Sequence, residues 1–149
     1  MSMIHEKMYQ SESLSKVNLE QYFRDLSNDL LSSFEIEYSV DFKYQFDVDR
    51  IELKSIVPLA LIFNELYSNS LKHAFKGGNE PSISLSVALT SDNSLLLEYS
   101  DSGNWKEPVK EMSFGLELIE SLTSQLDGEL RFEKSPTTKY VFLFKELGY

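Results

Sequence analysis

The sequence contains no cysteine, which excludes disulfide bonds and any zinc or iron–sulfur site held by thiolates. It also lacks an apolar run near the roughly 18 residues that span a bilayer. Basic residues are scarce, 14 against 24 acidic ones, for a net charge of −10. Duplex DNA and anionic membranes bind clustered positive charge, so we expect no nucleic-acid partner and no direct membrane contact.

The composition is that of one folded domain. The 149 residues are 42% hydrophobic and 13% aromatic, which is enough to form a core. Residues 1–13 are polar and look like the end of a linker from an upstream domain, although a frayed terminus fits them as well. We therefore place the domain at 14–149. The lack of cysteine suits a reducing compartment, so a cytoplasmic domain is expected, whether or not a longer parent protein is anchored in a membrane.

Hydrophobic spacing predicts three helices and five strands. Three- and four-residue steps indicate helices, with Pro58 in the first turn of the second one. Two-residue alternation indicates strands, and a polar loop is expected at 101–113. The predicted helices are 18–34, 55–75 and 114–126, and the predicted strands are 38–46, 82–89, 95–100, 129–133 and 140–144.

This order of elements predicts the fold class. Strands joined by hairpins must be antiparallel, and the remaining connections carry helices. Helices do not alternate with every strand, which disfavours a doubly wound parallel sheet. We expect an α/β two-layer sandwich, with a mixed, largely antiparallel sheet and three helices packed on one face.

The second predicted helix has two stripes of side chains. One is core-facing: Leu59, Ile62, Phe63, Leu66 and Ser70. The other joins Glu65, Asn69 and Lys72, about 100° away, on the wall of an expected pocket between helix and sheet. A carboxamide oxygen is a hard ligand suited to Mg²⁺, and a lysine suits a phosphate. An ordinary solvated ladder of polar side chains fits the same spacing, so this helix alone leaves both interpretations open.

Two further motifs follow in the chain. Asp101-Ser102-Gly103 ends a predicted strand, where a carboxylate can accept from an exocyclic amine and glycine allows close backbone approach. Ser113-Phe114-Gly115 opens the third predicted helix, whose free N–H groups and dipole can bind an anion. Each motif is weak alone, because Asp-x-Gly is also an everyday turn and every helix has an N-terminus.

Taken together, the motifs resemble the ATP-binding catalytic domain of two-component sensor histidine kinases, in the superfamily of the gyrase, Hsp90 and MutL ATPases. Residues 64–75 look like the N box of that family, 101–103 like its first glycine box, and 113–119 like its second. Residues 138–144 resemble the closing strand, and 4–11 resemble the stretch after the dimerisation helices in one subfamily. The resemblance covers nearly the whole chain and implies the Bergerat-type ATP-binding fold, a two-layer sandwich.

The resemblance also implies Mg-ATP as the ligand and a role for each matching residue. Asn69 would ligate Mg²⁺, and Lys72 and His73 would approach phosphate or ribose. Asp101 would accept from the adenine amino group, and Gly103 would admit the base.

Other roles in the family fall on the remaining motif residues. Thr138 would lie near the adenine floor, and Glu65 stands where the ATPases keep a catalytic carboxylate. In a kinase, Glu65 would orient or deprotonate the acceptor histidine. The start of the third helix would meet the phosphates through Ser113, Phe114, Gly115 and Leu116.

The sequence departs from the family pattern at three places. The first glycine box usually ends in a second glycine, but Trp105 stands there. Ser113 replaces a frequent glycine in the second box, and the loop at 104–112 leaves room only for a short ATP lid. Trp105 either stacks on the nucleotide, blocks backbone approach, or fills the rim of the core.

The phosphoacceptor histidine of the family has no counterpart here. His5 is too close to the domain and lacks the charged setting of an acceptor. We therefore expect a kinase catalytic domain whose partners are a histidine-bearing dimerisation domain and a response regulator. Two alternatives are a serine kinase of the anti-sigma-factor type and a degenerate regulatory domain that binds partners without turnover.

Overall fold

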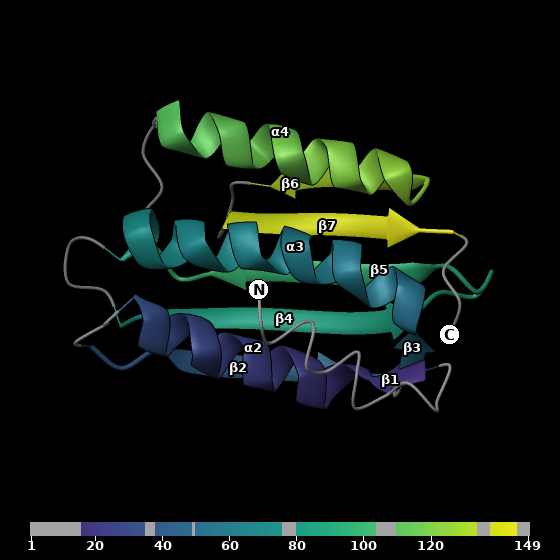
Figure 1. Ribbon diagram of the computed structural model, residues 1–149, viewed down its shortest axis with the longest axis horizontal. Helices are drawn as coiled ribbons and strands as arrows, with labels where there is room; N and C mark the ends of the chain where they lie inside the picture. Colours follow the sequence, from purple (N-terminus) through teal and green to yellow (C-terminus); the bar gives the residue numbers. More distant parts are fainter. Residues whose placement is uncertain are drawn as a thin grey trace.

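The computed structural model describes residues 16–34, 38–48, 50–75, 80–103, 110–133 and 138–145. A five-stranded sheet forms one layer, and three helices cover one of its faces (Figure 1). This arrangement confirms the predicted two-layer α/β sandwich. The elements in chain order are β1 (Lys16–Asn18), α2 (Leu19–Ser33), β2 (Asp41–Phe46), β3 (Arg50–Glu52), α3 (Leu53–Asn69), η1 (Ser70–Ala74), β4 (Ser82–Leu89), β5 (Leu95–Asp101), α4 (Lys110–Gln125), β6 (Gly128–Glu133) and β7 (Thr138–Phe144).

The five-stranded sheet has the order β2-β4-β5-β7-β6. Strands β2 and β4 are parallel because α3 crosses between them, and the other neighbouring pairs are antiparallel. The β4–β5 hairpin turns at Asn93, whose φ of 64° lies in the left-handed region that asparagine tolerates. The sheet is therefore mixed and largely antiparallel, as predicted.

Helix α2 is held against α3 by aromatic packing. Asn18 caps the helix, since its side-chain oxygen accepts from the Gln21 backbone nitrogen at 2.9 Å. The Phe23 ring packs edge-on against Phe63, with 5.0 Å between centroids, and stacks on Phe46 at 6.1 Å. These contacts place α2 on the same face of the sheet as α3, on the side away from α4 (Figure 1).

Helix α3 begins at Leu53, two residues before the predicted start, so Pro58 lies inside the helix and the prediction of its first turn was wrong. The core-facing stripe is confirmed, because all of its members are buried. After Asn69 the chain continues as the five-residue π-helix η1, which the sequence did not predict. A π-turn is wider than an α-turn and changes which side chains share a face.

Two other features of the fold differ from the prediction. Strands β1 and β3 form an unpredicted two-stranded antiparallel sheet, and three-residue strands are too short to show a two-residue period. The helix predicted from Phe114 begins at Lys110 instead. The predicted linker at 1–13 lies outside the described residues. Within the described ranges, no helix is long and apolar enough to cross a membrane.

Candidate functional site

Helices α3 and α4 lie side by side (Figure 1), and Gly115 of α4 faces two predicted site residues of α3, Glu65 and Asn69. A Cβ atom built on Gly115 would lie 2.6 Å from Oε2 of Glu65 and 3.6 Å from Nδ2 of Asn69. The missing side chain of Gly115 therefore makes room for both polar groups. Glu65 and Asn69 share one stripe, as predicted, but they face α4 and not a pocket between helix and sheet.

The carboxamide of Asn69 is buried, with 7% of the residue exposed, and its Nδ2 has no hydrogen-bond partner within the described residues. An unsatisfied buried donor costs about 1–3 kcal/mol, so a bound acceptor would remove a penalty. A phosphate oxygen is such an acceptor. The carbonyl oxygen of the same side chain is a suitable Mg²⁺ ligand, so this residue fits a magnesium nucleotide.

Asp101 lies at the end of β5 and is 5% exposed. The Gly103 backbone nitrogen donates to its Oδ1 at 3.0 Å, and the Ser70 hydroxyl donates to its Oδ2 at 2.6 Å. These two bonds fix both oxygens of the carboxylate, which accepts hydrogen bonds when ionised and can in principle accept from a ligand amine.

The bond from Ser70 continues into a buried network. The Tyr99 hydroxyl lies 2.7 Å from Oγ of Ser70 and 3.3 Å from the Leu66 carbonyl oxygen. Because Ser70 gives its one proton to Asp101, the Tyr99 proton is shared between the Ser70 oxygen and the more distant Leu66 carbonyl oxygen. Burial, with a smaller contribution from the charge of Asp101, raises the pKa of Tyr99 well above its ordinary value. Tyr99 therefore remains a protonated donor at neutral pH.

Gly103 packs against the end of the π-turn. A Cβ atom built on Gly103 would lie 2.7 Å from the carbonyl carbon of Ala74 and closer still to its oxygen and Cβ. The lack of a side chain at Gly103 allows Ala74 to approach its backbone closely, whereas the predicted approach of a nucleotide base to Gly103 stays a prediction. On the neighbouring strand, Thr138 is the register partner of Asp101, so the start of β7 lies beside the carboxylate.

Lys72 does not join Glu65 and Asn69. Its side chain is exposed, and the ammonium lies 5.4 Å from the centroid of the Phe34 ring, on the α2 side of α3. The predicted three-residue spacing fails because the π-turn begins after Asn69 and rotates the following residues. His73 lies half-buried in the same turn.

The second glycine box is not at the end of a helix. Because α4 begins at Lys110, the N–H groups of Phe114 and Gly115 fall beyond the first turn, where they serve hydrogen bonds within the helix. The predicted anion site at Ser113-Phe114-Gly115 therefore requires these groups to be freed. Leu116 packs half-buried against the core, and Trp105 lies outside the described residues.

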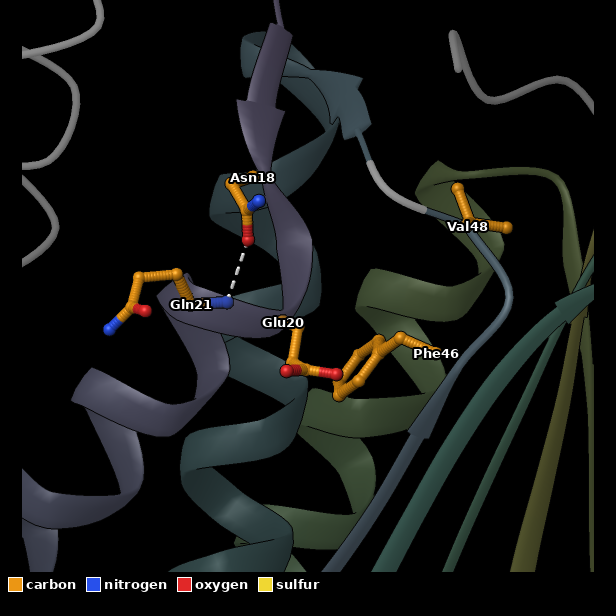
Figure 2. Close-up of a pocket in the computed structure, with 5 residues that line it drawn as sticks. All are labelled: Asn18, Glu20, Gln21, Phe46 and Val48. Atoms are coloured by element: carbon orange, nitrogen blue, oxygen red, sulfur yellow. Dashed lines mark hydrogen bonds between the residues drawn. The ribbon is translucent and has the colours of Figure 1, made fainter.

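The part of the chain that the structure describes holds no group of three or more His, Asp or Glu side chains placed to bind a metal. This does not conflict with magnesium, which keeps several waters and takes one or two protein ligands together with substrate phosphates. Two surface hollows are lined by none of the predicted site residues. One, of about 210 Å³, is shown in Figure 2 and is lined by Asn18, Glu20, Gln21, Phe46 and Val48. The other, of about 370 Å³, is lined by Lys43, Tyr44, Gln45, Ser84, Leu85, Ser86, Glu98, Ser100 and Lys139.

Sequence reasoning missed the supporting residues of the site. It assigned Ser70 only to the core-facing stripe and gave Tyr99 and Ala74 no role. A signal was present, because Tyr99 and Asp101 fall on the buried face of an alternating strand. A hydroxyl and a carboxylate on such a face need polar partners, and Ser70 is the polar residue on the facing stripe.

Comparison with known proteins places this geometry in context. A family model described as "Histidine kinase" (HisKA_2) matches residues 1–34. Comparison with curated protein sequences found no match. The histidine kinase domain of the Erythrobacter litoralis blue-light activated kinase EL346 superposes with a TM-score of 0.76 at 16% identity, covering 96% of this chain and 70% of that one. The fold is that of a histidine kinase catalytic domain.

Two further solved structures share this fold. The catalytic domain of histidine kinase ThkA gives a TM-score of 0.63 at 17% identity, with 87% and 94% of the two chains covered. Full-length ShkA in complex with AMPPNP gives 0.67 at 15% identity, covering 91% of this chain and 32% of that one. This chain also spans only 45% of the longer EL346 chain. The family resemblance seen in the sequence is thus confirmed in the fold.

Proposed function

We propose that this chain binds Mg-ATP and donates the γ-phosphate to a histidine on a separate dimerisation domain, as the catalytic domain of a sensor histidine kinase. The observation that carries this proposal is the meeting of the N box with both glycine boxes. Asn69 lies against Gly115, and its neighbour Ser70 bonds to Asp101. Gly115 therefore lies next to the buried, unsatisfied amide of Asn69, and Asp101 bonds to the residue that follows Asn69 in the chain.

Each gathered residue has a role in this proposal. The carboxamide oxygen of Asn69 would hold Mg²⁺, and its amide nitrogen would donate to a phosphate oxygen. When bound, Mg²⁺ neutralises charge on the phosphates. Asp101 would accept from the adenine amino group, while Gly103 and Thr138 would lie at the base. Lys72 and His73 would reach phosphate or ribose, which requires Lys72 to leave the Phe34 ring.

Glu65 is the candidate catalytic residue. Its carboxylate lies next to Asn69 on the same stripe and reaches the surface of Gly115. A half-buried carboxylate beside the phosphates could orient the acceptor histidine or take its proton. Ser113, Phe114, Gly115 and Leu116 would meet the phosphates if the first turns of α4 open.

The comparisons support this function over the alternatives. ShkA was solved with AMPPNP, an analogue of ATP, on the same fold. The match at residues 1–34 to a histidine kinase family model favours a histidine kinase over an anti-sigma-factor serine kinase. A dimerisation domain and a response regulator as partners, a role in two-component signalling and a cytoplasmic site of action follow from the same proposal.

Replacing Asn69 with alanine tests the proposal. We expect Asn69→Ala to weaken ATP binding at least tenfold in Mg²⁺, and chelation of Mg²⁺ to weaken binding by the unmutated chain. Asn28 is exposed on α2, so Asn28→Ala serves as the matched control. Equal ATP affinities of the Asn69→Ala and Asn28→Ala variants would show that Asn69 does not bind the nucleotide. Mg-ATP binding without phosphate transfer to any dimerisation domain would favour the regulatory alternative.

A further inference from the structure

Ser70 is a buried hydroxyl on an otherwise apolar stripe. Its exposed fraction is 0%, and the other members of the stripe are leucine, isoleucine and phenylalanine. A buried hydroxyl costs free energy unless it is hydrogen-bonded. Here the hydroxyl is bonded on both sides, to Tyr99 and to Asp101.

Two hydrogen bonds fix the carboxylate of Asp101, one from Ser70 and one from Gly103. The Ser70 hydroxyl donates to Oδ2 from the first position of η1, and the Gly103 backbone nitrogen donates to Oδ1 from the segment that follows β5. Two donors on different elements hold the plane of the carboxylate. The bond to Ser70 involves a charged acceptor, and such hydrogen bonds are about twice as strong as neutral ones.

The π-turn makes both contacts possible. Ser70 is the first residue of η1 and Ala74 is the last. Ser70 bonds the side chain of Asp101, and Ala74 packs against the backbone of Gly103. The π-turn thus contacts the Asp101–Gly103 segment at two points, through a hydrogen bond and through backbone packing. π-Turns are frequent at functional sites.

We infer that Ser70 is a positioning residue that holds Asp101 as a fixed acceptor and so selects a purine with an amino group at position 6. The inference rests on the proposed function, because it concerns the base of the same nucleotide. Adenine presents a donor at position 6, whereas hypoxanthine presents a carbonyl oxygen there. A fixed carboxylate accepts from the first and repels the second, and a carboxylate free to turn away discriminates less.

The test compares ATP with ITP, which differ at position 6, by calorimetric titration of the whole chain in Mg²⁺. We expect the preference for ATP over ITP to fall about fivefold in Ser70→Ala, which corresponds to one lost hydrogen bond. Ser27 is the matched control, because it is buried, donates to the Phe23 carbonyl and contacts the Tyr44 hydroxyl. Ser27→Ala should lower stability and leave the ATP/ITP ratio unchanged.

The outcomes separate this inference from the proposed function. If the unmutated chain binds ATP and prefers it to ITP, but Ser70→Ala keeps the full preference, the inference is overturned and the proposed function stands. If the unmutated chain binds no ATP, both are overturned. Should Ser70→Ala fail to fold, Ser70→Cys replaces it, since a thiol is a weaker donor of similar size. The preference of Ser70→Cys for ATP over ITP should be weaker than that of the unmutated chain but not lost. A preference equal to that of the unmutated chain would contradict the positioning role of Ser70.

Discussion

The backbone of Gly103 lies directly on Ala74, so closely that a Cβ atom on Gly103 would approach the Ala74 carbonyl carbon to 2.7 Å. This contact ties the end of β5 to the end of the π-turn. Gly103 belongs to the first glycine box and Ala74 to the N box. The distance between these two motifs therefore depends on a glycine at position 103.

Gly103→Ala is expected to destabilise the domain by about 2–3 kcal/mol, because an added methyl group meets backbone that cannot move locally. The free energy of unfolding in urea measures this. Gly115→Ala is the matched comparison, since its nearest obstacle is the flexible end of Glu65 at 2.6 Å. Alanine gains about 1 kcal/mol of helix propensity there, so the net change should stay below about 1 kcal/mol. Equal losses for the two variants would contradict the packing described.

No self-phosphorylation is expected from this chain. It contains only two histidines, His5 and His73, and neither stands in the sequence setting of an acceptor. Incubation with ATP labelled on the γ-phosphate should leave the chain unlabelled, while an added dimerisation domain that carries an acceptor histidine gains an acid-labile label. Label on His5 in the chain alone would show that the acceptor lies within it.

Trp105 is the only tryptophan, and it is two residues beyond Gly103. Addition of Mg-ATP should therefore change the indole fluorescence, through stacking or altered contact with water. If the indole stacks on the base, Trp105→Gly should weaken ATP binding roughly five- to tenfold. If it obstructs the site, the same variant should bind ATP at least as tightly. If Mg-ATP leaves the indole fluorescence unchanged and Trp105→Gly leaves the ATP affinity unchanged, the first glycine box does not lie at the nucleotide.

Stability should fall at alkaline pH because of buried tyrosines. Burial raises the pKa of Tyr22 from 10.0 to about 12, and burial with the nearby charge of Asp101 does the same for Tyr140. The unfolded chain ionises near pH 10, so it loses these protons first. The stabilisation is complete below pH 10 and is lost as the pH rises through 12.

Urea unfolding at a series of pH values checks this expectation. At pH 11, each of the two tyrosines should reduce the free energy of unfolding by about 1 kcal/mol relative to pH 9. Tyr140→Phe should remove its share of the pH dependence, while Tyr38→Phe, at a more exposed position, should remove less. Stability that stays constant to pH 12 would show that these hydroxyls ionise as freely in the fold as outside it.

The layered fold could be predicted because its long elements have strong periods. Helix α2 was placed from its apolar steps and the Asn18 cap, and β4 from alternation between buried and half-buried side chains. The start of α4 could not be placed, because residues 110–113 carry no apolar stripe and read as a polar loop. Helix α4 as a whole packs along α3, and such tertiary packing is not visible in the local polarity of the sequence.

The arrangement of the predicted site residues follows the sequence expectation only in part. Glu65 and Asn69 share a stripe as their spacing predicts, whereas Lys72 leaves it. A π-turn has no simple sequence pattern, so a spacing argument that assumes 3.6 residues per turn fails beyond Asn69. The Ser70–Asp101 bond joins residues that are 31 positions apart, and only the tertiary fold brings them together.

Calorimetric titration of the chain with ATP and GTP in Mg²⁺ tests the central claim most directly. The account predicts saturable ATP binding and a clear preference over GTP, because the Asp101 carboxylate accepts from the adenine amine and repels the guanine carbonyl. Asp101→Asn should weaken that preference, since an amide donates as well as accepts. Equal affinities of the unmutated chain for ATP and GTP, or no binding of either, would contradict the claim.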